Sequence, residues 1–201
     1  MAKLYYIHAP MGCGKSAHLL MKAHAFLEND ITVLCIKPSV DTRDGKDVIK
    51  SRIGIQMDCL SIDDCDNIYN IIENYIDELQ LRDISNLQWI LCDESQFLTS
   101  KHVEQLSKIV DELNINVMCY GLRNDFTGHL FEGSKRLMEL ADNIEELKFN
   151  CSCGRKAIIN ARMDDFGNIL QEGEQIQIGG NEMYKPLCRK CYFKKINENK
   201  Y

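Results

Sequence analysis

The feature that most constrains the fold of this chain is a glycine-rich turn close to its first residue. An apolar run at residues 4–8 predicts a β-strand, the turn at residues 9–16 ends in Gly14, Lys15 and Ser16, and a helical pattern follows. Strand, glycine-rich turn and helix in this order form a P-loop, whose backbone N–H groups, lysine and helix N-terminus bind phosphate. The turn therefore predicts a nucleoside triphosphate site on an α/β fold.

The turn departs from the usual pattern at its first position, where Ala9 replaces glycine. Alanine fits there if the backbone has an ordinary negative φ. A chance glycine-rich turn is the alternative, and the strand and helix on either side disfavour it. We expect the whole turn to contact ATP and the hydroxyl of Ser16 to bind Mg²⁺. The expected ATP-contacting residues are Ala9, Pro10, Met11, Gly12, Cys13, Gly14, Lys15 and Ser16.

Composition is that of an ordinary soluble globular protein. The 201 residues suffice for one good-sized domain and a small appendage, and 45% are hydrophobic while 27% are charged. The net charge of -6 argues against nucleic acid as a partner, because duplex-binding proteins usually carry a basic face. No apolar run approaches the ~20 residues that span a bilayer, and we expect neither a signal peptide nor a membrane partner. Ten cysteines without a secretion signal favour a reducing compartment, so we expect a cytoplasmic protein.

Short apolar runs alternate with helical patterns, which indicates a mostly parallel sheet flanked by helices. We expect strands at residues 3–8, 32–37, 87–92, 116–121 and 144–149, helices at 16–27, 65–78, 101–113 and 131–140, and a polar loop at 38–54. The alternation ends at Cys151. We therefore predict a P-loop (RecA-like) α/β domain at residues 1–150, a small zinc-binding domain at 151–193 and a flexible tail at 194–201.

Two acidic residues, Asp93 and Glu94, follow the apolar run at residues 87–92. This is the form of a Walker B strand, in which the first carboxylate reaches Mg²⁺ and the second faces the reacting phosphate. A strand that ends in a solvated acidic turn is the alternative, which the P-loop in the same chain disfavours. We expect Glu94 to act as general base toward the oxygen that attacks the γ-phosphate. The pair leaves open whether that oxygen belongs to water, as in an ATPase, or to a substrate hydroxyl, as in a kinase.

Two close cysteine pairs, Cys151 with Cys153 and Cys188 with Cys191, lie beyond the predicted boundary. Four thiolates suit tetrahedral Zn²⁺ and leave no open coordination position, so the expected zinc is structural. Two unrelated pairs of buried cysteines are the alternative. The glycine-containing segment 173–184 lies between the pairs. It is equally compatible with a loop that folds over a small ligand and with a β-hairpin.

Taken in order, these motifs resemble the cytosolic-type (type II) thymidine kinase family. The resemblance covers residues 4–195 and includes the P-loop, the acidic motif continued to Phe97, and both cysteine motifs. Further matching stretches are Lys37-Pro38, Asp41-Thr42-Arg43, Ser51-Arg52-Ile53-Gly54, Tyr120-Gly121-Leu122-Arg123, Asp125-Phe126, Phe131-x-Gly133-Ser134 and Ile178-Gly179-Gly180-Asn181-Glu182-x-Tyr184. The departures from the family pattern are Ala9, Gly12-Cys13 in place of Phe-Ser, Ser95 in place of alanine, and Cys191 in place of histidine.

The resemblance implies that ATP phosphorylates thymidine, and deoxyuridine, at the 5′-hydroxyl, in pyrimidine deoxynucleotide salvage for DNA synthesis. It implies that Glu94 accepts the proton and that Phe126 stacks on the base. The further ATP contacts that it implies are Asp93, Glu94, Ser95 and Gln96, with Asp93 and Ser16 at Mg²⁺. A "lasso" loop would hold the pyrimidine edge, through Gln175, Ile176, Gln177, Ile178, Gly179 and Tyr184. A homotetramer and feedback inhibition by thymidine triphosphate are also implied.

Three arginines, Arg43, Arg52 and Arg123, are candidate cations for the transition-state charge, and Arg52 is the preferred one. Two other function classes stay open at this point. One is a P-loop ATPase coupled to nucleic acid, which the acidic net charge and the few aromatic residues between basic ones at 151–192 disfavour. The other is a non-catalytic, zinc-bearing nucleotide sensor, which the two carboxylates after the Walker B strand disfavour.

Overall fold

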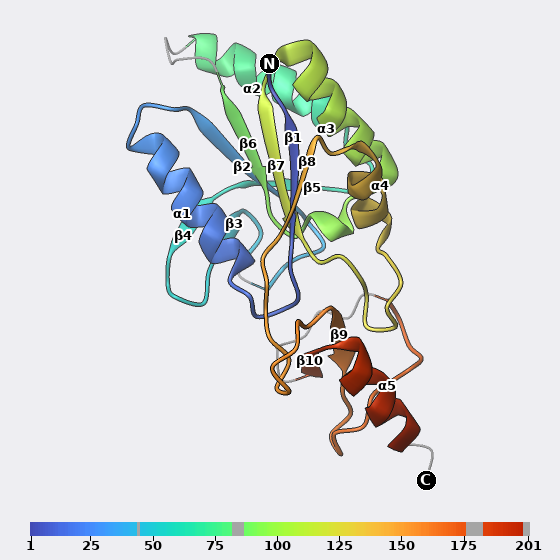
Figure 1. The fold of residues 1–201 in the computed structure, drawn as a ribbon. Helices are drawn as coiled ribbons and strands as arrows, with labels where there is room; N and C mark the ends of the chain where they lie inside the picture. Colours follow the sequence, from blue (N-terminus) through green and yellow to red (C-terminus); the bar gives the residue numbers. More distant parts are fainter. Residues whose placement is uncertain (44, 82–86, 176–182, 199–201) are drawn as a thin grey trace.

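The larger part of the molecule is built on one six-stranded sheet. The computed structural model describes residues 1–43, 45–81, 87–175 and 183–198. Every strand pairing in the sheet is parallel, and the strand order is β5-β2-β6-β7-β1-β8 (Figure 1). The strands are β1 (Leu4–His8), β2 (Val33–Pro38), β5 (Leu60–Ile62), β6 (Trp89–Cys92), β7 (Asn116–Gly121) and β8 (Asn143–Glu146). The P-loop strand β1 and the Walker B strand β6 therefore both neighbour β7.

Helices cover both faces of this sheet. Helix α1 (Lys15–Leu27) lies on one face, and α2 (Ile68–Leu81), α3 (Ser100–Leu113) and α4 (Glu132–Leu140) lie on the other (Figure 1). Alternation along the strands explains the two layers, because successive side chains point to opposite faces. Ile7 and Leu91 pack in the cluster with α1, whereas Tyr6 and Ile90 pack in the cluster with α2 and α3. The predicted α/β fold is confirmed.

The predicted strands and helices appear within a few residues of their expected limits, and β7 has the predicted limits. Short elements were missed in and after the predicted loop 38–54. A hairpin of β3 (Val48–Lys50) and β4 (Gln56–Asp58) lies there, followed by β5. Each of these strands has three residues, which is too short for an apolar run to stand out.

Residues 151–198 form a smaller unit, which we call the C-terminal module. It contains the antiparallel strands β9 (Ile159–Arg162) and β10 (Tyr184–Leu187) and helix α5 (Arg189–Glu198) (Figure 1). A hydrophobic cluster of its own, separate from the two clusters that pack on the sheet, holds these elements together.

Helix α5 extends into the segment 194–201, which was expected to be a flexible tail. Ile196 packs into the module's cluster, and Lys194 pairs with Glu198 one helical turn away, so the helix continues through Glu198. Residues 199–201 lie outside the described residues. Among the described residues, no helix has the length and apolar character that crossing a bilayer requires.

Candidate active site

A cavity of about 880 Å³ is lined by residues that follow the parallel strands and by residues of the C-terminal module. The carboxyl ends of the strands face this module (Figure 1). This edge is where ligands bind in open α/β sheets. The P-loop lines the cavity through Met11, Gly12, Gly14, Lys15 and Ser16. The turn after β6 contributes Asp93, Glu94 and Gln96. The loop after β7 contributes Phe126, and the C-terminal module contributes Asn160, Gln175 and Tyr184, so the two parts of the molecule build one cavity together.

The phosphate turn has the backbone that its glycines predict. Gly12 and Gly14 have φ values of +79° and +74°, a region that residues with a Cβ rarely adopt. Gly14 is also the N-cap of α1, so the N-terminus of that helix opens toward the cavity. The ammonium of Lys15 is buried and donates to the carbonyl oxygens of Ala9 and Pro10, at 3.4 and 3.2 Å. Burial lowers the pKa of Lys15, and the nearby carboxylates of Glu94 and Asp93 oppose that shift.

Asp93 is a buried carboxyl group with an unusual proton affinity. Burial and the neighbouring charge of Glu94 raise the pKa of Asp93 to about 7, and a hydrogen bond with the side chain of Ser16 acts against them. The two side chains that were predicted to bind Mg²⁺, Ser16 and Asp93, therefore contact one another at the edge of the phosphate turn. Bringing a cation to this position would favour the ionised form of Asp93.

Glu94 is held in a left-handed conformation, with a φ of +49°, which few residues other than glycine adopt. One carboxylate oxygen accepts from Arg43 Nη2 at 2.5 Å, and the other accepts from Gln96 Nε2 at 2.5 Å. Burial acts to raise the pKa of Glu94, but the cations Arg43 and Lys15 outweigh it and hold the pKa below its ordinary value. Glu94 is therefore ionised at neutral pH and able to accept a proton.

The three candidate arginines lie in different places. Arg43 pairs with both Glu94 and Asp41, and the second contact joins Arg43 Nε to Asp41 Oδ1 at 2.6 Å. Arg52 also lines the cavity, on the same side as Gly12. Arg123 is absent from the described residues that line the cavity, and it donates to the side chain of Asn124. The structure therefore brings Arg43 and Arg52, but not Arg123, to the cavity. The sequence alone contained no pattern that could distinguish among the three arginines.

Four of the predicted ATP-contacting residues, Ala9, Pro10, Cys13 and Ser95, are not among the lining residues. Ser95 belongs to the 3-10 turn η1 (Ser95–Phe97) and is fully buried, and its hydroxyl is without a hydrogen-bond partner among the described residues. A Cβ added to Gly121 would lie 2.6 Å from Ser95 Oγ, so β7 can approach this turn only because residue 121 is glycine. Gln96 ties the same turn to the end of β7 by accepting from the N–H of Leu122 at 2.9 Å.

The far side of the cavity is organised around Phe126 and Asp125. Phe126 is buried yet lines the cavity. The carboxylate of Asp125 accepts from the N–H groups of Thr127 and His129, which fixes the loop that carries Phe126. Its other oxygen accepts from Gln175 Nε2 at 2.9 Å. Gln175 and Tyr184 line the cavity as well, whereas Ile176, Gln177, Ile178 and Gly179 lie outside the described residues.

Sequence reasoning missed two polar residues of β9, Asn160 and Arg162. Both are buried, with 4% and 2% of their surface exposed. The side-chain oxygen of Asn160 accepts from the N–H of Met11 at 2.7 Å, which joins the C-terminal module to the phosphate turn. The guanidinium of Arg162 lies over the ring of Phe126, 3.9 Å from its centroid. The sequence offered one indication of them: a polar amide and a cation alternate with the apolar residues Ile159 and Ala161 in this short segment.

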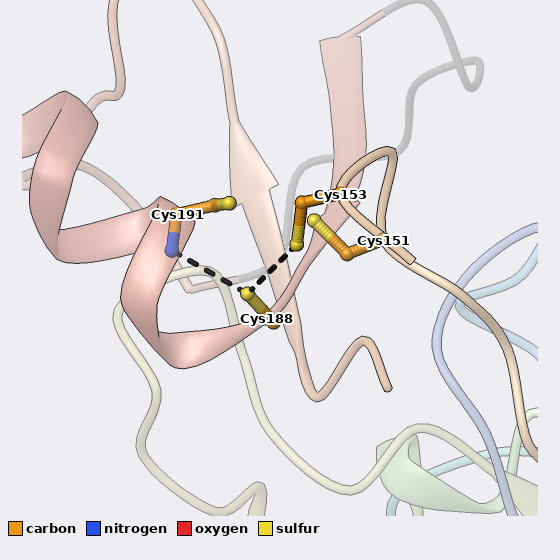
Figure 2. A group of neighbouring side chains, drawn as sticks. All are labelled: Cys151, Cys153, Cys188 and Cys191. Carbon is orange, nitrogen blue, oxygen red and sulfur yellow. Dashed lines mark hydrogen bonds between the residues drawn. The ribbon is translucent and has the colours of Figure 1, made fainter. Parts of the chain in front are cut away.

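The four predicted metal-binding cysteines come together. Cys151 and Cys153 lie before β9, Cys188 and Cys191 lie at the start of α5, and their side chains converge (Figure 2). All four sulfur atoms lie within 4.8 Å of one another. Burial acts to raise the pKa of Cys151, but hydrogen bonds from the backbone at Cys153 and Cys188 lower it to about 6. Cys151 can therefore supply a thiolate to a metal ion, whereas hydrogen bonds with Cys153 and Cys188 raise the pKa of Cys191 to about 12 before a cation binds.

The parallel sheet, the phosphate turn and the acidic turn beside it define a P-loop nucleotide-binding protein. Comparison with known families makes this more specific. The family model for thymidine kinase matches residues 2–192, so this chain belongs to the thymidine kinase family.

Individual relatives span nearly the whole chain. The thymidine kinase of Streptococcus gordonii is 46% identical over 195 residues, which cover 96% of this chain and 97% of that protein. The thymidine kinase of Rhodopirellula baltica is 44% identical over 189 residues, covering 94% of this chain and 87% of the relative. That of Haemophilus influenzae strain 86-028NP is 42% identical, covering 98% and 100%. Among solved structures, an ATPase domain aligns with a TM-score of 0.47 at 16% identity, over 74% of this chain and 69% of that one.

Proposed function

We propose that this protein transfers the γ-phosphate of ATP to the 5′-hydroxyl of thymidine. The observation that carries the proposal is a single cavity with a phosphate turn and Glu94 on one side and Phe126 and Tyr184 on the other. An ATPase needs only the first side. An aromatic ring and polar groups on the second side suit a nucleobase, and the relatives that span the chain are named thymidine kinase.

The ATP phosphates would lie against the backbone of residues 9–16 and the side chain of Lys15, with residues 93–96 beside them. Ser16 and Asp93 fit Mg²⁺, because they offer oxygen ligands in contact with each other and because a cation would relieve the raised pKa of Asp93. When bound with ATP, Mg²⁺ neutralises phosphate charge.

Glu94 would take the proton from the 5′-hydroxyl as that oxygen attacks the γ-phosphate. Its lowered pKa keeps it ionised, and the hydrogen bond from Gln96 orients the carboxylate. Arg43 and Arg52 both line the cavity and are the candidate cations for the transferring phosphoryl group. Our sequence-based preference for Arg52 stays a proposal, and the contact of Arg43 with Glu94 makes Arg43 an equal candidate.

The base would stack on Phe126, while the lasso residues Gln175, Ile176, Gln177, Ile178, Gly179 and Tyr184 hold its edge. A site of this kind rejects purines by size. It discriminates weakly between thymidine and deoxyuridine, because one methyl group is worth only about 1–3 kcal/mol. Deoxyuridine is therefore a second proposed substrate, and pyrimidine deoxynucleotide salvage for DNA synthesis is the proposed role.

The cysteine cluster fits a structural Zn²⁺. Four thiolate ligands would complete a tetrahedral site and leave no position for a substrate, and the mutual distances within 4.8 Å suit zinc–sulfur bonds of about 2.3 Å. Such an ion would hold the loop before β9 to the start of α5.

The family resemblance supports further proposals about the setting of the enzyme. These are a cytoplasmic homotetramer, inhibition by thymidine triphosphate, and no nucleic acid or membrane partner.

A steady-state assay tests the proposed function. With MgATP, we expect ADP release to depend on thymidine or deoxyuridine and to yield the 5′-monophosphate, with no stimulation by deoxyguanosine. Hydrolysis of ATP that no nucleoside changes, but that single-stranded DNA stimulates, would overturn the proposal and favour a nucleic-acid-coupled ATPase.

A further inference from the structure

Arg162 is a buried cation that does not itself reach the cavity. It ends β9, has 2% of its surface exposed, and is absent from the described residues that line the cavity, whereas Phe126 and Tyr184 are present among them. Seen from the cavity, Arg162 therefore lies behind these two aromatic residues.

The guanidinium of Arg162 holds three segments of the chain at once. Its central carbon Cζ lies over the ring of Phe126, and Nε donates to the hydroxyl of Tyr184 at 2.9 Å. Nη1 donates to the carbonyl oxygen of Glu174 at 2.9 Å, and Nη2 to that of Gln175 at 3.5 Å. These contacts join three separate segments of the chain, and three of the contacted residues line the cavity: Phe126, Gln175 and Tyr184.

Among the described residues, the charge of Arg162 is balanced by dipoles instead of a carboxylate. None of the ion pairs among the described residues includes Arg162. Its partners are two carbonyl oxygens, a hydroxyl and the face of an aromatic ring. Burying a cation in this way costs free energy, and the planar fork of donors is what makes several simultaneous contacts possible. Lysine has the charge but cannot reproduce this geometry.

We propose that Arg162 is a positioning residue for the nucleoside. Its guanidinium packs on the ring of Phe126 from the side away from the cavity. It thereby aligns this ring with Gln175 and Tyr184, which lie at the two ends of the lasso segment in the sequence. The inference rests on the proposed thymidine kinase function and adds to it a residue that the substrate does not touch.

The test compares Arg162→Lys and Arg162→Met with a control, Lys185→Met, which removes an exposed charge from the neighbouring strand β10. In both Arg162 variants we expect the KM for thymidine to rise about 10- to 100-fold, because the aromatic ring and the lasso ends lose their alignment. The KM for ATP and the kcat at saturating thymidine should stay within about threefold of the unaltered enzyme, since Arg162 touches neither ATP nor the reacting atoms. The control should match the unaltered enzyme in all three constants.

A thymidine KM in Arg162→Lys equal to that of the unaltered enzyme would overturn the proposal, because charge alone would then suffice. Equal rises in both KM values with loss of bound metal would also overturn it, because they would show a merely structural role.

A second variant covers the case in which Arg162→Met does not fold. Tyr184→Phe removes only the hydroxyl that Arg162 contacts. Each single variant, Tyr184→Phe and Arg162→Lys, should raise the thymidine KM by some factor. In the double variant, the rise in thymidine KM should be smaller than the product of those two factors by about threefold or more, because both substitutions remove the same contact. Effects that multiply fully would contradict the proposed contact. Absence of thymidine phosphorylation by the unaltered protein would overturn the proposed function instead.

Discussion

The two sides of the cavity are built in different ways. The phosphate side consists of two short segments, at 9–16 and 93–96, that follow strands β1 and β6 on either side of β7 in a large sheet. The nucleoside side is assembled from distant residues: Gln175 contacts Asp125 across 50 positions, and Tyr192 donates to the carbonyl oxygen of Phe126 across 66. The comparison teaches that one short motif can specify a phosphate site, whereas the proposed base site depends on the folding of a separate module.

The two parts also differ in what stabilises them. The sheet buries two hydrophobic clusters, one on each face. The C-terminal module has a smaller cluster made largely of alanine, isoleucine and cysteine side chains. Units this small usually need a metal or disulfides in addition to their core. We therefore expect the nucleoside side to depend on the cysteine cluster and the phosphate side to be nearly independent of it.

The largest expected effect belongs to the phosphate side. Glu94→Gln keeps the size of the side chain but removes the proposed base, so kcat should fall by about 10²–10⁴-fold. Binding of a non-hydrolysable ATP analogue, measured by calorimetry, should change little. Glu145→Gln, which alters an exposed acid on β8, is the control and should leave kcat unchanged. Near-normal turnover in Glu94→Gln would place the base elsewhere.

The next largest effect is expected from loss of a cluster cysteine, which should change the KM for thymidine much more than the KM for ATP. If the cluster binds zinc as proposed, Cys188→Ser should lose that metal and raise the KM for thymidine about 10- to 100-fold, with a much smaller change for ATP, because the four cysteines all belong to the C-terminal module. Metal content and both KM values are measured together. Cys65→Ser, at an exposed cysteine outside the cluster, is the matched control. Full metal content with unaltered thymidine affinity in Cys188→Ser would refute the linkage.

Asn160 joins the two sides, and its replacement should affect both. In Asn160→Ala the partly buried N–H of Met11 loses its partner, which should cost about 1 kcal/mol, the lower end of the range for an unsatisfied donor. We expect the KM values for ATP and thymidine to rise together, by about tenfold. A rise confined to thymidine would mean that the hydrogen bond serves the C-terminal module alone.

The smallest expected effect concerns stability. Ser95 has a fully buried hydroxyl without a partner among the described residues, so Ser95→Ala should remove a desolvation cost of about 1–3 kcal/mol. For a chain of this size, each kcal/mol corresponds to a Tm increase of about 2–4 °C, which calorimetry resolves. A lower Tm in Ser95→Ala would show that the hydroxyl contributes a favourable interaction.

The same contrast explains what the sequence could predict. The strands β1, β2, β6 and β7 could be predicted because they are mostly apolar runs. The phosphate turn, the acidic turn and the cysteine pairs could be predicted because the residues of each motif are close together in the sequence. The role of Arg162 could not be predicted, because its contacts depend on how β9 packs against the loop at Phe126. The hairpin of β3 and β4 was missed because it lacks an apolar run. Its placement brings Arg52 to the cavity, which no local pattern indicated.

The central claim is that Glu94 contacts the hydroxyl that attacks ATP. A crystal structure with thymidine and a non-hydrolysable ATP analogue tests it most directly. The account predicts that the 5′-oxygen lies about 2.6–3.2 Å from the carboxylate of Glu94 and in line with the γ-phosphorus. A complex in which Glu94 still pairs with Arg43, and the 5′-oxygen lies beyond hydrogen-bond reach of the carboxylate, would contradict it.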